Sequence, residues 1–356
     1  MLESSFVHTS FSSRVVFGAS SRNLLADEIS RLGARRALIL TTPEQLELGD
    51  MVRGLLGTSA VGHFGEARQH VPIEVAHEAQ KVASDLGADC IVAIGGGSTI
   101  GLGKAIALQS ALPVLALPTT YAGSEMTPIY GLTDGSNKRT GRDVKVLPRT
   151  VIYDPELTLT LPLALSVMSG LNAIAHCAEG LYATDGSPIT SLIAEESVRT
   201  FAASLPRIKA CPTDMQARSE CLYAAWLAGS VLAVTSVALH HKLCHTMGGM
   251  LDLPHAHMHA IVLPHSIAYN APAAPEAMCR LGRALGSSRP AQALFDLAEE
   301  LDVPMGLNCL GVQPEQLPAV ATAALAAPYP NPRELRFEGI LGLLQDAQSG
   351  RRPQSG

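Results

Sequence analysis

Short apolar runs alternate with amphipathic stretches along the first 155 residues of the chain. Runs typical of β-strands cover residues 37–41, 60–64, 90–94, 113–117 and 150–153. Residues 21–32, before the first run, and 73–86, between two later runs, show the apolar spacing of helices. Each stretch ends near a glycine, Gly33 or Gly87, that suits the position after a helix. Strands alternating with helices of this length predict βαβ units and a mostly parallel sheet.

The pattern changes at Asp154-Pro155, where the strands stop. From residue 162 onward the chain is rich in Ala and Leu and is predicted to be helical. We therefore expect an α/β domain over residues 1–155 followed by an all-α domain over residues 156–356. Residues 221–239 carry no charge and are just long enough to span a bilayer, but their Ala, Gly, Ser and Thr content favours a buried core helix.

Composition and charge narrow the class of protein. Hydrophobic residues make up 47% of the 356 positions and charged residues 16%, which is typical of a globular chain. A net charge of −6 without a long basic run argues against a nucleic-acid partner. The seven cysteines include no CxxC pair, and the N-terminus shows no secretory signal. These features predict reduced thiols and a cytoplasmic protein without a membrane partner.

Two loops at predicted strand ends carry a signal for nucleotide binding. The segment CIVAIGGGSTIGLGK, residues 90–104, runs from a strand through three glycines into a helix, whose first N–H groups can bind a phosphate. A second strand ends in the hydroxyl-rich loop PTTYAGSE, residues 118–125. Neither loop has the G-x-G-x-x-G spacing, so two purely structural turns are the alternative. The residues expected to contact a cofactor are Gly95, Gly96, Gly97, Ser98, Thr119, Thr120, Tyr121 and Ser124.

The place after the predicted strand over 37–41 bears on cofactor choice. It reads Thr41-Thr42-Pro43-Glu44, without an acidic residue directly at the strand end to bind a ribose 2′-hydroxyl. The hydroxyl of Thr41 is expected to tolerate either NADH or NADPH.

Histidines gather in one part of the predicted helical domain. Seven of the twelve fall between residues 240 and 265. His241 and His245 are four residues apart and share a helix face, as do Asn172 and His176. Gly248-Gly249 and Leu253-Pro254 are expected to break the helix before His255. This density is typical of a metal site with His176, His241 and His255 as ligands, and separate core histidines are the alternative.

The ordered set of these motifs resembles the iron-containing alcohol dehydrogenase family. The set comprises GGGS at 95–98, PTTYAGSE at 118–125, YDP at 153–155, N-x-x-x-H at 172–176, H-x-x-x-H at 241–245 and His255. The resemblance implies a dinucleotide-binding α/β domain, a helical domain and catalysis in the cleft between them. It also implies a homodimer, and it matches Lys138 to a family lysine near the cofactor.

One departure points to a branch of that family. Metal-dependent members have an Asp at the position of Asn172 and three histidines at the positions of His176, His241 and His255. A neutral amide weakens the binding of a divalent cation. Asn172, the shortened PTTYAGSE loop and the segments HHKLCHTMGG (240–249) and KRTGRDVKVLPRTVIYDP (138–155) are similar to the maleylacetate reductase branch. That resemblance implies reduction of maleylacetate to 3-oxoadipate with NADH or NADPH, in bacterial breakdown of aromatic compounds, and no bound metal.

The chemistry of such a substrate assigns roles to the candidate residues. Hydride addition to a C=C bond conjugated with a ketone produces an enolate, so a site must stabilise an oxyanion and deliver a proton. His241 and His245 are expected to do this, with Lys242 holding a carboxylate of the dianion and Asn172 and His176 facing them. Basic residues between 138 and 149 suit a dicarboxylate or cofactor phosphates, or else form a solvated hairpin. The alternatives are a metal-dependent alcohol or polyol dehydrogenase and a non-catalytic nucleotide-binding protein.

Overall fold

The computed structural model describes residues 6–135 and 137–354, and for Asn137 and Lys138 only the backbone. The chain divides into two compact units. One is contiguous, from Phe11 to Leu161, and the other joins the segment ending at Ser10 to residues 162–356. His8 Nδ1 lies 3.0 Å from Ser187 Oγ, which ties the N-terminal segment to the second unit.

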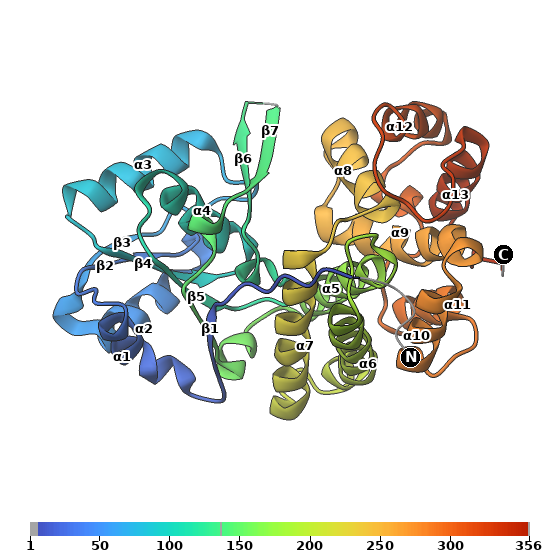
Figure 1. Ribbon diagram of the computed structural model, residues 1–356. Coiled ribbons are helices and arrows are strands. Elements are labelled where there is room, and N and C mark those ends of the chain that lie inside the picture. Colours follow the sequence, from blue (N-terminus) through green and yellow to red (C-terminus); the bar gives the residue numbers. More distant parts are fainter. Residues whose placement is uncertain (1–5, 136, 355–356) are drawn as a thin grey trace. The chain divides into compact units, whose positions relative to one another are not determined.

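The first unit contains a six-stranded sheet with the order β1-β8-β5-β4-β2-β3 (Figure 1). Every strand pair in it is parallel, which confirms the predicted parallel sheet. The five expected strands are all present, and a sixth, β1, was not predicted. The strands are β1 Arg14–Phe17, β2 Ala37–Leu40, β3 Ala60–Phe64, β4 Cys90–Gly95, β5 Val114–Pro118 and β8 Thr150–Tyr153.

Helices cover both faces of this sheet (Figure 1). Along β2, Leu38 and Leu40 pack toward α3 (Ile73–Asp85) and α4 (Gly97–Ser110). Ala37 and Ile39 point to the opposite face and pack toward α1 (Leu25–Arg31) and α2 (Leu46–Leu56). This alternation follows from the two-residue period of a strand and produces a three-layer α/β unit.

The glycine-terminated helices form as expected, with one local difference. Gly33 and Gly87 have φ of 75° and 58°, the left-handed conformation that ends a helix. The helix predicted over 21–32 begins with a 3-10 turn, Ser21–Leu24, before α1.

A two-stranded antiparallel hairpin projects from the first unit (Figure 1). It consists of β6 (Ile129–Asp134) and β7 (Asn137–Arg142). Part of the basic segment that begins at residue 138 therefore lies in a hairpin, where the Arg139 side chain is 71% exposed and pairs with Asp134.

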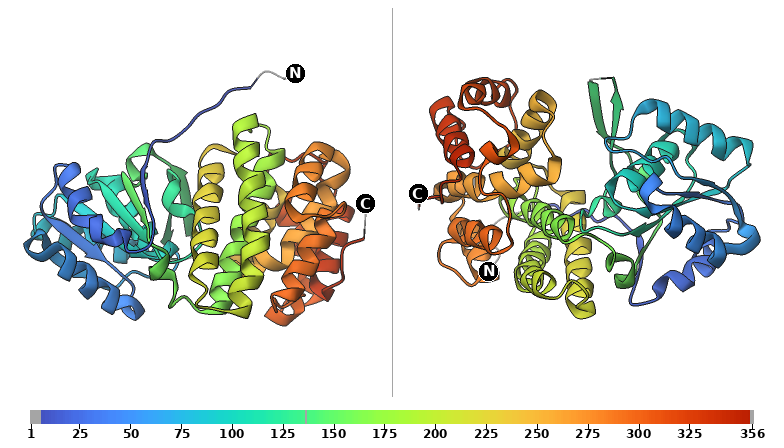
Figure 2. Two further views of the ribbon diagram at one scale, coloured as in Figure 1. Left: turned by 90° about the horizontal axis from the view of Figure 1, so that it is seen from below. Right: turned by 180° about the vertical axis from the view of Figure 1, so that it is seen from behind.

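The second unit is built from helices, as predicted. Helices α6 and α7 run side by side and pack on α5, while α9 packs on α5, α8, α11 and α13 (Figure 2). Their bounds are α5 Leu163–Tyr182, α6 Pro188–Ala210, α7 Met215–Val234, α8 Leu239–Leu251, α9 His255–Asn270, α10 Pro275–Leu285, α11 Pro290–Glu300, α12 Leu317–Ala324 and α13 Phe337–Ser349.

The uncharged stretch over 221–239 occupies most of α7 and the turn before α8. Within the described ranges, no single helix has the length and hydropathy needed to cross a membrane. The pair α7 and α8 meets those requirements together but is bent by 92°.

The expected helix break at Gly248-Gly249 is wrong. Helix α8 continues through both glycines to Leu251, and the chain turns only at Asp252, whose φ is 52°. A Cβ on Gly248 would lie 3.2 Å from Met258 Cε, so α9 packs closely against this part of α8.

Candidate active site

The glycine-rich loop joins β4 to α4 at the carboxyl edge of the sheet. Gly95 has a φ of 150°, which side-chain-bearing residues rarely adopt, and a Cβ there would lie 2.5 Å from Thr99 Oγ1. A Cβ on Gly96 would lie 2.9 Å from Thr120 Cγ2. A Cβ on Gly97 would meet nothing within 4 Å. The first two glycines are therefore required by the loop's own packing, whereas the third borders open space at the start of α4.

The structure brings the two predicted loops together. Thr119 N donates to Gly95 O at 3.0 Å, and Gln45 Nε2 donates to Thr119 Oγ1 at 3.2 Å. The N-cap residue of α4, Gly96, makes no side-chain capping hydrogen bond. Within the described residues, the buried hydroxyls of Thr99 and Ser124 have no hydrogen-bond partner. Uncapped N–H groups beside the open space at Gly97, together with orphaned hydroxyls in the two loops, fit a dinucleotide diphosphate.

Two predicted cofactor residues, Tyr121 and Thr41, have fully buried side chains, and the side chain of a third, Lys138, is not among those described. The Tyr121 side chain is fully buried. The Thr41 hydroxyl is also buried and lies 2.8 Å from His63 Nε2, so it is already engaged. The expected contact of Lys138 lies outside the described side chains.

A buried network of hydrogen bonds holds the end of the second loop. Lys104 Nζ donates to the carbonyl oxygens of Ser124 at 2.5 Å and of Thr127 and Ile129 at 2.8 Å, and also to Thr127 Oγ1. Tyr153 donates its hydroxyl hydrogen to the buried Glu125 carboxylate at 2.8 Å. Burial lowers the pKa of Lys104 to about 7, and it raises the pKa of Glu125. Lys104 therefore holds the end of the loop against α4.

The second unit gathers the histidine cluster from three helices. Helix α8 supplies His240, His241 and His245, and α9 supplies His255 and His259. The ring centroids of His241 and His245 are 5.9 Å apart, and the stacked rings of His245 and His255 are 6.1 Å apart. Helix α5 contributes Asn172, His176 and Glu179. The sequence spacing therefore correctly brought the predicted histidines together.

Glu179, which belongs to none of the sequence motifs, organises this cluster. Its carboxylate accepts hydrogen bonds from Ala238 N at 2.8 Å and His240 N at 2.7 Å, at the start of α8. It also accepts from His241 Nδ1 at 2.6 Å. An anion at a helix N-terminus is favoured by the unpaired N–H groups and the helix dipole. The available signal was a glutamate three residues after His176, on the same helix face.

These bonds fix the proton positions on two histidines. An ionised carboxylate only accepts, so His241 Nδ1 carries the proton shared with Glu179. The other nitrogen, His241 Nε2, lies 2.8 Å from His176 Nδ1 and accepts from it when neutral. Both ring nitrogens of the buried His241 are thus engaged within the protein. His245, by contrast, is exposed, and Lys242 is half-buried.

A second buried pair lies behind the first. His240 Nε2 is 2.9 Å from His259 Nδ1, and His240 Nδ1 is 3.2 Å from Ser266 Oγ. Burial, together with the neighbouring imidazoles, lowers the pKa of both His240 and His259 well below the usual range. These two histidines are neutral and had no assigned role in the sequence analysis.

The residues expected at a metal site, Asn172, His176, His241 and His255, include no carboxylate, which weakens the binding of a divalent cation. Asn172 offers a neutral amide oxygen that is buried with no partner in the described structure. His241 Nε2 lies at hydrogen-bond distance from a ring nitrogen of His176. However, His240, Cys244 and His259 form a buried group whose ligand atoms lie within 4.8 Å of one another and could hold a metal. Independence from metal therefore stays a prediction.

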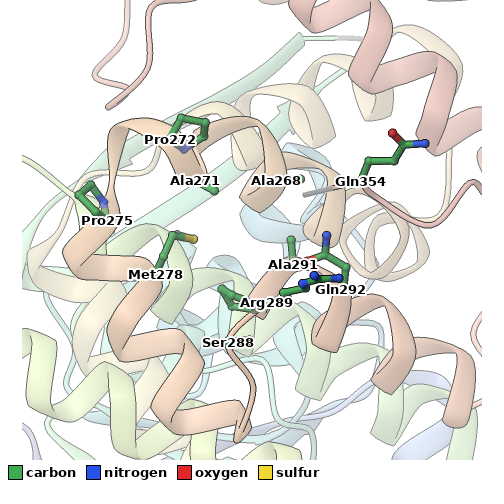
Figure 3. A pocket seen from close by; sticks show the side chains of 11 residues that line it. Ala268, Ala271, Pro272, Pro275, Met278, Ser288, Arg289, Ala291, Gln292 and Gln354 are labelled. Atoms are coloured by element: carbon green, nitrogen blue, oxygen red, sulfur yellow. The ribbon is translucent and has the colours of Figure 1, made fainter. Parts of the chain in front are cut away.

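A separate hollow lies on the second unit, among α9, α10 and α11 (Figure 3). Its lining includes Ala268, Met278, Arg289, Gln292 and Gln354. None of the clustered histidines lines it, so this hollow is distinct from the histidine cluster.

Comparison with known proteins identifies the family. The pattern of iron-containing alcohol dehydrogenase matches residues 12–155, and that of the C-terminal part of the Fe-containing alcohol dehydrogenase family matches residues 166–348. The chain belongs to the iron-containing alcohol dehydrogenase family, which confirms the predicted resemblance and makes the protein an oxidoreductase.

Within this family, the chain is similar to maleylacetate reductases along nearly its whole length. It is 57% identical over 340 residues to the enzyme of Burkholderia cepacia, which covers 96% of this chain and 97% of the relative. It is 56% identical to the enzyme of Sphingobium indicum, covering 98% of this chain and 99% of the relative. The crystal structure of maleylacetate reductase from Agrobacterium tumefaciens matches with a TM-score of 0.96 at 48% identity, covering 98% and 100%.

Proposed function

We propose that this protein reduces maleylacetate to 3-oxoadipate with NADH or NADPH. The observation that carries the proposal is the similarity, at 48–57% identity over nearly full length, to proteins named maleylacetate reductase. The reaction consumes one hydride and one proton and converts a conjugated C=C bond to a single bond. The site must therefore bind a dianion, stabilise an enolate and deliver the proton.

The α/β unit has the features of the cofactor site. The N–H groups at the start of α4 and the hydroxyls of Thr99 and Ser124 would hold the diphosphate, with Gly97 leaving room for it. When bound, the nicotinamide cofactor supplies the hydride that adds to the C=C bond. Lys104 keeps the second loop in place by binding the carbonyl oxygens at its end.

The histidine cluster divides into positioning groups and a group that meets the substrate. Glu179 accepts a hydrogen bond from His241, and His241 in turn accepts one from His176. This series of hydrogen bonds stabilises the cluster and the ionised form of any ring that gains a proton. The exposed His245 delivers the proton to the enolate, and His255, whose ring stacks on that of His245, stabilises the oxyanion. His241, expected from the sequence to share this task, acts as a positioning group because both of its ring nitrogens are engaged within the protein. Lys242, one residue beyond His241, binds a substrate carboxylate.

A spectrophotometric assay tests this proposal. Purified protein should oxidise NADH or NADPH, seen as loss of nicotinamide absorbance, only when maleylacetate is added, and 3-oxoadipate should accumulate in equal amount. Oxidation of simple alcohols or diols with NAD⁺, without activity on maleylacetate, would refute it in favour of an alcohol dehydrogenase. The homodimer implied by the family resemblance stays a prediction, which light scattering measures.

A further inference from the structure

Tyr329 has a buried polar group that the protein does not use. It lies in the segment between α12 and α13, with a half-buried ring. Its hydroxyl is buried and has no hydrogen-bond partner in the described part of the chain. Burying a hydroxyl without a partner is unfavourable, so an orphaned group of this kind points to a ligand that is not part of the protein.

The segment that carries Tyr329 is firmly held. Asn331 and Asn270 exchange two amide hydrogen bonds, of 2.8 and 3.0 Å. Arg333 donates to Tyr269 O at 2.8 Å, and its guanidinium lies 4.5 Å from the centre of the Tyr269 ring. These contacts anchor the segment to the end of α9, the helix that begins with His255. The position of Tyr329, two residues before Asn331, is therefore set before any ligand binds.

The Tyr329 ring also contacts the histidine cluster through Lys242. The Lys242 ammonium nitrogen lies 5.8 Å from the centre of the ring, within the range of a cation–π contact. Burial and the negative charge of Glu179 both raise the pKa of Tyr329, so its hydroxyl keeps its proton. The site thus presents two groups that can both donate hydrogen bonds, one of them positively charged.

We propose that Tyr329 and Lys242 together bind one carboxylate of the substrate. The Tyr329 hydroxyl donates a hydrogen bond to a carboxylate oxygen, and the Lys242 ammonium supplies the opposite charge. A pair made only of donors selects an acceptor-only anion and gives no advantage to a neutral alcohol. This inference rests on the proposed function, because it names the residues that would recognise the acid groups of the substrate.

The substitution Tyr329→Phe tests the inference, since it removes the hydroxyl and keeps the ring. A hydrogen bond to a charged group contributes roughly ten- to hundredfold in affinity. We expect KM for maleylacetate to rise by about that factor, with kcat within about threefold of wild type because the contact is shared by ground and transition states. The dissociation constant for NADH should not change. Tyr223→Phe, on α7, is the matched control and should leave all three constants unchanged.

A double substitution tests whether the two residues share one carboxylate. The single substitution Lys242→Met should raise KM for maleylacetate. Adding Tyr329→Phe to Lys242→Met should then raise KM by much less than Tyr329→Phe does in the wild-type background. Full additivity, or a KM for Tyr329→Phe within twofold of wild type, would overturn the inference. An unchanged KM for Lys242→Met would also overturn it, even if Tyr329→Phe failed to fold. Wild-type protein that is inactive on maleylacetate would instead refute the proposed function itself.

Discussion

The substitution Gly97→Ala separates the role of the glycine-rich loop in binding from its role in folding. A Cβ at this position meets no atom within 4 Å, and the residue opens helix α4 without a left-handed φ. Alanine loses less backbone entropy than glycine on folding, so the free energy of unfolding should stay equal or rise by about 0.5–1 kcal/mol. The fold therefore gives no reason for glycine at this position.

The cofactor would give that reason. If a diphosphate binds the N–H groups at the start of α4, a methyl group on Gly97 occupies the space where it must approach. Loss or lengthening of one hydrogen bond to a charged group costs about 1.5–3 kcal/mol, which predicts a ten- to hundredfold increase in the dissociation constant for NADH. Fluorescence titration with NADH measures this, and chemical denaturation measures the stability of the same sample.

Two other glycine substitutions serve as comparisons for Gly97→Ala. Gly54→Ala, in helix α2, also meets no atom within 4 Å and should stabilise the protein without weakening NADH binding. Gly96→Ala would place a Cβ 2.9 Å from Thr120 Cγ2, so it should disturb the loop itself and cannot distinguish the two roles. Binding of NADH by Gly97→Ala within twofold of wild type would show that the loop is only a structural turn.

Four further changes test the rest of the site. His245→Ala should lower kcat by ~10²–10⁴-fold while NADH binding persists, because it removes the proposed proton donor; steady-state kinetics with a kcat within twofold of wild type would exclude that role. Glu179→Gln should lower the free energy of unfolding by about 1–3 kcal/mol, since the amide cannot accept all three N–H groups; urea titration measures this, and an unchanged midpoint would contradict it. Lys104→Met should destabilise the protein by about 2–3 kcal/mol through unpaired carbonyl groups. The pKa of Lys104 is about 7 in the fold and near 10.4 in the unfolded chain, so between these pH values only the unfolded chain keeps the proton. The free energy of unfolding of the wild type, relative to Lys104→Met, should therefore rise by up to about 1.4 kcal/mol per pH unit from pH 7 to 9. A flat difference would show that the four surrounding oxygens keep Lys104 charged. Asn172→Asp should raise the affinity for Fe²⁺ or Zn²⁺ by restoring an anionic oxygen; elemental analysis measures it, and stoichiometric metal with EDTA-sensitive activity in the wild type would overturn the expected independence from metal.

Most of the strands that the sequence predicts well are buried on both sides. The buried strand over 150–153 has the predicted bounds, as does the half-buried edge strand over 60–64, and the other three differ by one residue at one or both ends. Strands of a covered parallel sheet read as continuous apolar runs, and such runs are visible without tertiary information. The missed strand β1 is a half-exposed edge strand of four residues, and the hairpin β6–β7 is largely polar, so neither carries that signal.

In the candidate site, too, the sequence predicts some features and not others. Helical spacing placed His241 beside His245 because residues four apart share a face. Spacing could not show that His241 is buried with both nitrogens engaged while His245 is exposed, since depth depends on α5 and α9. Glu179 and Tyr329 were missed because their partners on α8 lie far away along the chain. The spacing of Glu179 from His176 indicates a shared helix face but not the contacts with α8.

The division of the chain into units also affects the order in which the protein can fold during synthesis. The α/β unit is a continuous insertion, so it can complete its sheet as soon as residue 161 has been made. The segment ending at Ser10 is synthesised before the α/β unit but belongs to the helical unit, and Ser187, the partner of His8, follows 179 residues later. This contact must therefore wait until the whole α/β unit and the start of α6 have been synthesised. Removing this segment should leave folding of the α/β unit intact and affect only the later assembly of the helices.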